Sequence, residues 1–279
     1  MSMSLSNIEI QQFISDAHAE FQSQGFLLEP SVRVKQGTRG EIINVPVFGK
    51  GIANQKGIQD DVTPLDINSR NVTLTMQDWF APEYVDRTFK YKLAVNATQE
   101  YSSLCAQAIG RRSDQMIINA IASANFGGGA EQGNTVTVSG NATYEQFLQG
   151  HRFLRQNAAA KGDLFCIMDA DAEANLLADD HFTNIFFMKS QTLAGNGLDG
   201  QEILGIRIIV LPNMPEGGLE DGTFYMYNRQ AIGYAANARL EGTIDWVPTK
   251  ASYLINMWLE ANACVIDQTG MVKCVYTPN

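Results

Sequence analysis

The sequence of this 279-residue chain predicts an α+β fold from three observations. Residues 96–124 form a long helical stretch without proline, residues 41–48 and 71–80 form two strand-like runs, and helix and strand signals alternate after residue 143. Hydrophobic residues make up 45% of the chain and charged residues 18%. This composition is typical of a globular protein, and it suits a chain whose copies cover part of each other's surface.

The N-terminal stretch, residues 1–30, is predicted to be an amphipathic arm that ends near Gly25 and Pro30. Its apolar residues recur at helical spacing, at Ile10, Phe13, Ile14, Ala17 and Phe21. The apolar side could pack on the chain's own core or on a neighbouring copy.

A long hairpin is predicted next. In its second strand Val72 and Leu74 alternate with Thr73 and Thr75, and a polar, glycine-rich tip at residues 49–64 separates the strands. Two strands and such a tip cannot form a core of their own. We therefore expect the hairpin to lie on another surface.

The helix at residues 96–124 has marked ends. Gln99 follows Asn96 at capping-box spacing, and the glycine run after Asn125 cannot extend a helix without an entropic cost. Its apolar stripe changes face: one side carries Ala97, Tyr101, Leu104 and Ala108, and the opposite side Ile117, Ala120 and Ile121. This pattern predicts a helix that contacts two different parts of the molecule, with a kink at Gly110 in an ordinary helix as the alternative.

After residue 143 the pattern is that of an α/β region. Thr143 and Gln146 form a capping box that opens a helix to about residue 157. We expect a buried strand at residues 164–168, a helix at 169–178, and strands at 203–211, 223–227 and 231–235. The last two strands, residues 253–266 and 271–276, are predicted to pair through a turn at residues 267–270.

The charge and the cysteine spacing argue against a nucleic-acid-binding protein and against a cysteine metal site. The net charge is −10, and the longest basic run is Arg111-Arg112, so avid binding of nucleic acid through its phosphates is not expected. Cys105, Cys166, Cys264 and Cys274 lack metal-site spacing and are predicted to be reduced and mostly buried. The sequence has no signal peptide and no apolar run that could span a bilayer, which predicts cytoplasmic synthesis without a membrane partner.

Two motifs resemble ligand sites. Residues Gly195–Gly200 match GxGxxG, but a strand-like run follows where a dinucleotide site needs a helix, so we expect a mobile loop. Asp169, Asp171 and Glu173 resemble a metal loop, but an EF-hand would need glycine at Ala174, and acidic residues suit the first turn of a helix. The histidines, His18, His151 and His181, are scattered. We therefore predict no catalytic residues, no metal site and no cofactor.

The order of these elements resembles the major capsid proteins of tailed bacteriophages over essentially the whole chain. The residues that carry the resemblance are the hairpin at 32–80, the helix segment Ala108–Asp114, the strand Leu204–Ile206 and the ending Ala263–Asp267. Encapsulin shells share this fold.

The resemblance implies a domain order and a set of interface residues. The implied parts are an N-terminal arm (1–30), an extended hairpin loop (31–80), a peripheral domain with the spine helix (81–142), an axial domain (143–242), and closing strands of the peripheral domain (243–279). The candidate subunit-interface residues are Lys50, Asn54, Lys56, Asp60, Asp61, Arg111 and Arg112.

The implied function is that of the major capsid protein of a tailed double-stranded DNA phage. The chain would assemble with itself into hexamers and pentamers of an icosahedral shell in the virion. A separate scaffolding protein is implied because the chain has no long N-terminal helical extension, and a portal and a cement protein are further implied partners. The packaged DNA would be held without specific binding. The alternatives are an encapsulin-type compartment around protein cargo and a soluble α/β enzyme that uses the loop at residues 195–200.

Overall fold

The computed structural model describes most of the chain from residue 25 onward. The described residues are 25–37, 40–49, 51, 53–55, 58, 61, 64–65, 67–87, 97–126, 134–157, 163–179, 181, 197–212, 218–237 and 240–277, with the backbone alone for 97–100. The predicted amphipathic pattern at residues 10–21 lies outside this part of the chain.

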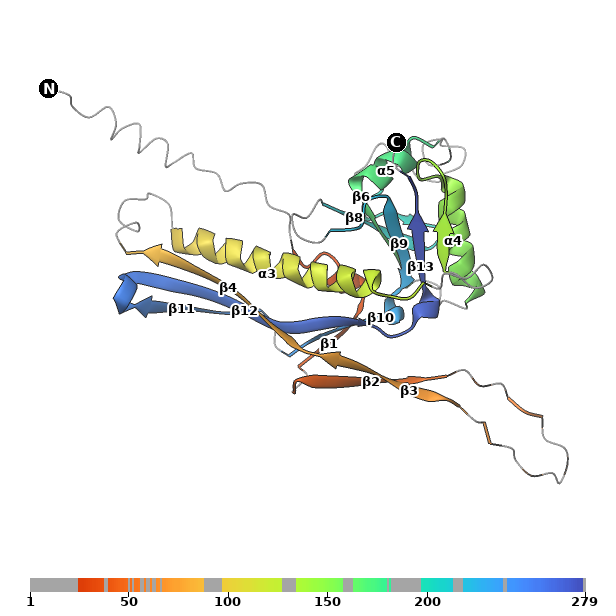
Figure 1. Cartoon of the computed structure of the whole chain (residues 1–279), viewed down its shortest axis with the longest axis horizontal. Helices are drawn as coiled ribbons and strands as arrows, with labels where there is room; N and C mark the ends of the chain where they lie inside the picture. Colours follow the sequence, from red (N-terminus) through yellow and green to blue (C-terminus); the bar gives the residue numbers. More distant parts are fainter. Residues whose placement is uncertain are drawn as a thin grey trace.

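The fold is α+β, as predicted, and its strands form two larger sheets and one hairpin (Figure 1). The five-stranded sheet has the order β1 (Arg33–Gln36), β10 (Ile232–Ala236), β12 (Ser252–Val265), β11 (Glu241–Val247), with β4 (Gln77–Asp86) also paired to β12. The six-stranded sheet has the order β5 (Thr135–Thr137), β13 (Met271–Val275), β9 (Thr223–Asn228), β6 (Leu164–Asp169), β8 (Ile206–Leu211), β7 (Glu202–Ile203). The hairpin consists of β2 (Ile42–Phe48) and β3 (Ser69–Thr75).

The long helix α3 (Ala97–Ala122) confirms the predicted helix to within two residues at each end. Near its start Tyr101 packs against the buried pair Val85 and Ile255, which lie on β4 and β12. Its C-terminal half belongs instead to the main core of the molecule, with Ile117, Ala120 and Ile121 buried there. The predicted contact with two different parts of the molecule is confirmed, but the predicted change of face is wrong. The buried residues Cys105, Ile109, Ser113, Ile117 and Ile121 recur every fourth position on one continuous face, and the C-terminal half is buried on further sides as well.

Gly110 has a packing role in the middle of α3. A Cβ atom on Gly25 would lie 2.4 Å from the Gly110 backbone, so the chain before β1 crosses α3 at two glycines that approach closely. The chain then forms the 3-10 turn η1 (Glu29–Ser31) and enters β1.

The helices of the α/β region begin within one residue of the predicted positions, but the Gln146 half of the predicted capping box is not formed, because the Gln146 side chain donates instead to the carbonyls of Val136 and Val275. Thr143 caps α4 (Tyr144–Gln156) by accepting the N–H of Gln146 at 3.4 Å. Asp169 caps α5 (Ala170–Leu177) by accepting the N–H of Ala172 at 2.8 Å, so the acidic residues lie in the first turn of a helix as expected. Both helices cover the six-stranded sheet, and this region has a closed core of its own.

The predicted strand at residues 71–80 is two strands. β3 pairs with β2, whereas β4 pairs with β12, and the chain changes sheet at Met76, whose N–H is donated to the carbonyl of Glu41 at 2.8 Å. The apolar alternation ends at Met76, because Asp78 follows in the same series and Trp79 and Phe80 are adjacent apolar residues, so the sequence held a sign of the change that the prediction of one strand did not use.

The predicted pairing of the last two strands is wrong. β12 pairs with β4, β10 and β11, whereas β13 joins β5 and β9 in the other sheet. The N–H groups of Ile266 and Asp267 both donate to the carbonyl of Ala231, and these two hydrogen bonds follow directly on the end of β12. Asp267 then caps the 3-10 turn η5 (Gln268–Gly270). This turn directs the chain into the six-stranded sheet instead of back along β12.

A mobile loop was expected at residues 195–200. Residues 197–200 instead form a fixed turn, and Gly195 and Asn196 lie outside the described residues. Leu198 is fully buried, and its N–H is donated to Glu173 Oε1 at 2.7 Å. Gly197 and Gly200 have positive φ angles, so these glycines serve the turn. The short strand β7 follows, in agreement with the argument against a dinucleotide site.

The four cysteines are free, as predicted. Cys105, Cys166 and Cys274 are buried and Cys264 is half-buried. Burial raises the pKa of each thiol, which keeps these side chains protonated and unreactive at neutral pH.

Candidate assembly interface

The root of the hairpin is fixed to the five-stranded sheet. Ile43 and Leu74 lie opposite each other in β2 and β3, and they pack with Met76 and Ala235 in a small buried cluster. Two side-chain hydrogen bonds tie the strands to the sheet: Arg70 Nη2 donates to the carbonyl of Ile266 at 2.9 Å, and Asn262 Nδ2 donates to the carbonyl of Thr75 at 2.7 Å.

The hairpin root and α3 use opposite faces of β10. Tyr234 and Ala236 belong to the main core that contains α3, whereas Ala235, which points the other way, contacts the hairpin. Figure 1 agrees, since β2 and β3 lie on the far side of the sheet from α3 and run away from it. The hairpin is therefore attached to the outside of the core.

Beyond the root the hairpin packs less closely on the sheet, although Arg70 still donates its hydrogen bond to the carbonyl of Ile266. Val45 and Val72, the next pair on the inner face, are only half-buried. A cavity of about 360 Å³ separates the hairpin from the sheet, with Phe48 and Ile266 among its lining residues. The hairpin thus stands away from the body instead of closing on it.

Large apolar side chains are exposed along the hairpin. The exposed fraction is 73% for Phe48 and 98% for Ile58, and the other exposed apolar residues of this segment are Ile42, Leu65 and Ile67. Single exposed apolar residues are ordinary, but a series on a two-stranded projection indicates a contact surface.

The four predicted interface residues that the structure describes fall into two separate places. Asn54 and Asp61 are exposed in the hairpin segment, and Lys50, Lys56 and Asp60 lie outside the described residues. Arg111 and Arg112 lie on α3, on the other side of the sheet. The structure therefore does not bring the seven residues together, and their contact with a second subunit stays a prediction.

Arg112 already has contacts within the subunit. Its guanidinium carbon lies 3.7 Å from the ring centre of Trp79 on β4, and its Nη1 donates to Gln115 Oε1 at 3.0 Å. A cation over an aromatic ring stabilises the packing of a helix on a strand, and this contact ties α3 to β4.

Sequence reasoning did not single out a second exposed surface, on β4 and β11. Phe80 and Tyr84 on β4 are 60% and 43% exposed, and Ile244 and Trp246 on β11 are exposed as well. Lys250 Nζ lies 3.7 Å from the ring centre of Tyr84. The sequence of β4 did contain a signal for this surface, because apolar residues occupy both of its alternating faces. Such a pattern is typical of a strand that is covered on both sides.

These surfaces offer apolar and aromatic contact. Within the described ranges, no group of three or more His, Cys, Asp or Glu side chains could hold a metal ion. No helix in the part of the chain that the structure describes is long and apolar enough to cross a membrane.

Comparisons with known proteins agree with this arrangement. The family model described as phage capsid protein matches residues 5–277. No match was found among curated protein sequences. Among solved structures, the head of Helicobacter pylori bacteriophage KHP40 has a TM-score of 0.76 at 8% identity and covers 99% of this chain and 96% of its own.

Two further structures extend the likeness. The capsid of cyanophage P-SCSP1u has a TM-score of 0.74 at 12% identity, covering 100% of this chain and 96% of its own. Mycobacterium phage Che8 has a TM-score of 0.67 at 16% identity, covering 92% and 93%. With a family match over nearly its whole length and the fold of tailed-phage shells, this chain belongs to the phage capsid protein family and is a major capsid protein.

Proposed function

We propose that copies of this chain join through the hairpin into hexamers and pentamers, which close into an icosahedral shell around double-stranded DNA. The observation that carries this proposal is the hairpin itself: a buried root of four residues, a cavity behind it, and exposed apolar side chains along its length. A projection of this kind has little to bury within its own subunit, so its contacts come from a neighbour.

The small root suits a shell that needs one sequence in several positions. Pentamers and hexamers place the neighbouring subunit at different angles, so an arm with a narrow attachment can follow it without repacking the core. Each contact is then modest, and the closed shell gains its stability from many such contacts at once.

The charge of the subunit suits packaged DNA that is enclosed without being bound. The net charge is −10, so a tightly packed duplex is not held to the wall by phosphate contacts. We expect no appreciable binding of duplex DNA by the purified subunit at physiological salt. A submicromolar binding isotherm with a steep salt dependence would contradict this.

The remaining partners follow from the same proposal. A separate scaffolding protein would set the curvature of the growing shell, and a portal and a cement protein would complete and reinforce it. Synthesis in the host cytoplasm precedes incorporation into the virion.

Sedimentation and negative-stain electron microscopy of the expressed full-length chain test the proposal. We expect capsomers or closed shells of megadalton size. A small oligomer that never assembles, alone or with co-expressed scaffolding protein, would contradict it and favour the soluble enzyme. Particles that enclose a protein cargo instead of DNA would favour the encapsulin-type compartment.

A further inference from the structure

The chain before β1 is fastened across α3 by one buried carboxylate. Leu27 donates its backbone N–H to Asp114 Oδ2 at 3.1 Å, and Leu28 donates its own to Asp114 Oδ1 at 2.9 Å. Both oxygens of a side chain in the middle of α3 are therefore used to hold the backbone of another segment. We call residues 25–32 the strap.

The strap is part of the main core. Leu28 and Val32 are fully buried there. Phe26 donates its N–H to the carbonyl of Gly110 at 3.3 Å, and the hydroxyl groups of Ser31 and Tyr227 are hydrogen-bonded at 2.6 Å. Removing the strap would expose both the apolar contacts and the Asp114 carboxylate to water.

In the part of the chain that the structure describes, no positively charged group is among those that shift the pKa of Asp114. Its side chain is fully buried. The strap contributes Glu29, which has the same sign, and β9 and β10 contribute the hydroxyl groups of Tyr227 and Tyr234. Arg112, which precedes Asp114 by two residues on α3, lies over the ring of Trp79.

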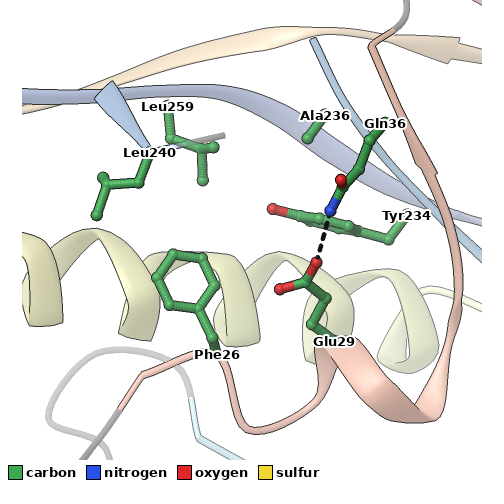
Figure 2. Close-up of a pocket in the computed structure, with 7 residues that line it drawn as sticks. All are labelled: Phe26, Glu29, Gln36, Tyr234, Ala236, Leu240 and Leu259. Carbon is green, nitrogen blue, oxygen red and sulfur yellow. Dashed lines mark hydrogen bonds between the residues drawn. The ribbon is translucent and has the colours of Figure 1, made fainter. Parts of the chain in front are cut away.

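Glu29 adds to the negative charge from an open position. Figure 2 shows its carboxylate beside Tyr234, at a pocket of about 250 Å³ between the strap and the five-stranded sheet. Glu29 Oε1 accepts a hydrogen bond from Gln36 Nε2 at 3.1 Å. This contact holds the acidic side chain on the strap close to α3.

We propose that the strap is a proton-sensitive device: docking of residues 25–32 on α3 is coupled to proton uptake by Asp114, so that the strap is held more tightly in acid than at neutral pH. The physical basis is that docking removes a carboxylate from water without supplying a cation, and burial penalises its charged form. A protonated carboxyl group still accepts hydrogen bonds, so it remains able to hold the strap.

The sign follows from the two states of Asp114. Burial, aided by the charge of Glu29, raises the pKa of docked Asp114 to about 6, although hydrogen bonds from the backbone of the strap act to lower it. With the strap released, the carboxyl group meets water and its pKa returns to the ordinary value of 3.8. The added stability of docking is therefore complete below pH 3.8 and is lost as the pH rises through about 6.

Hydrogen exchange of the strap amides in the full-length, unassembled chain tests this proposal. The strap peptide is compared between pH 4.5 and pH 7.5 after correction for intrinsic exchange rates, with the buried β6 peptide as internal reference. With a pKa of about 6 for the docked state and 3.8 for the released state, protection at pH 4.5 is expected to exceed that at pH 7.5 by a factor of roughly 25. Equal protection at both values, or greater protection at neutral pH, would overturn the proposal.

Two variants separate titration of Asp114 from a general effect of pH. Asp114→Asn is expected to leave protection of the strap independent of pH. Asp199→Asn is the matched control, because Asp199 also accepts a backbone N–H, that of Val210 at 3.0 Å, but at an exposed turn. This control should keep the full pH dependence of the strap. A persistent pH dependence in Asp114→Asn, or its loss in Asp199→Asn, would contradict the assignment.

If Asp114→Asn does not fold, carbon-13 NMR titration of the aspartate carboxyl groups in the unchanged chain decides the matter. One group with a pKa near 6 is expected. If every aspartate titrates near its ordinary value, the proposal fails. The measurement uses unassembled protein, so it can fail or succeed independently of the proposed shell.

Discussion

The six-stranded sheet and the hairpin are built from similar strands but use their apolar residues in opposite ways. Every residue of β9 is buried, and its neighbours form a closed core with α4 and α5. In the hairpin only Ile43 and Leu74 are buried, whereas Phe48 and Ile42 face water. The difference indicates that the first region stabilises the subunit, and it supports the proposal that the second serves contact between subunits.

The largest effect is expected for Phe147→Ala in α4. Phe147 is fully buried in the core against the six-stranded sheet, and deleting a buried phenylalanine side chain costs about 3–5 kcal/mol. Chemical denaturation of the unassembled subunit measures this loss. Leu148→Ala, one residue along and 43% exposed, is the control and should change the free energy of unfolding far less.

An intermediate effect is expected at the hairpin root. Leu74→Ala removes half of the central apolar pair, and the expected loss is about 2–3 kcal/mol, near the lower end for buried leucine because a cavity already lies beside the site. Hydrogen exchange should place the loss in β2 and β3. Thr73→Ala, on the exposed face, should leave exchange unchanged; equal effects of both variants would show that the root does not anchor the hairpin.

Gly110→Ala is expected to destabilise the subunit, although helix propensity alone predicts that it would stabilise it. Alanine normally stabilises a helix by up to about 1 kcal/mol relative to glycine. Here its Cβ would lie 2.8 Å from Gly25 Cα and from the ring of Phe26, so we expect a net loss of about 1–3 kcal/mol in thermal or chemical unfolding. A gain in stability would contradict the close crossing of the strap over α3.

The smallest effect on folding is expected for Phe48→Ala. Because Phe48 is 73% exposed, the free energy of unfolding should change by less than about 0.5 kcal/mol, in contrast to the same substitution at Phe147. The yield of assembled particles, measured by sedimentation, should nevertheless fall. An unchanged yield would remove Phe48 from the interface.

The sequence was informative where single residues mark the ends of helices. Thr143 and Asp169 cap their helices, and the glycine run after residue 125 correctly indicated the end of α3. The predicted change of face within α3 was wrong, because the spacing of apolar residues takes no account of the buried polar residues Ser113, Asp114 and Gln115 in the middle of the helix.

The sequence could not assign strands to sheets. Alternation indicates which residues share a face but not which neighbour pairs with the strand, so the separation of β13 from β12 left no signal, and the break in alternation at Asp78 does not reveal that β4 pairs with β12. Asp114 follows two arginines and reads as part of a solvated charged segment, although it is fully buried. Its role depends on the strap, which is 86 residues away from it in the chain.

The claim that the hairpin serves assembly is tested most directly by replacing residues 54–61, Asn54 to Asp61, with a short Gly-Ser turn and measuring both folding and assembly. Loop closure depends only weakly on length, so circular dichroism and thermal melting of the subunit should stay nearly unchanged. The yield of closed shells should collapse. Normal shells from the shortened chain, or failure of the chain to fold, would contradict the assignment of this segment to contacts between subunits.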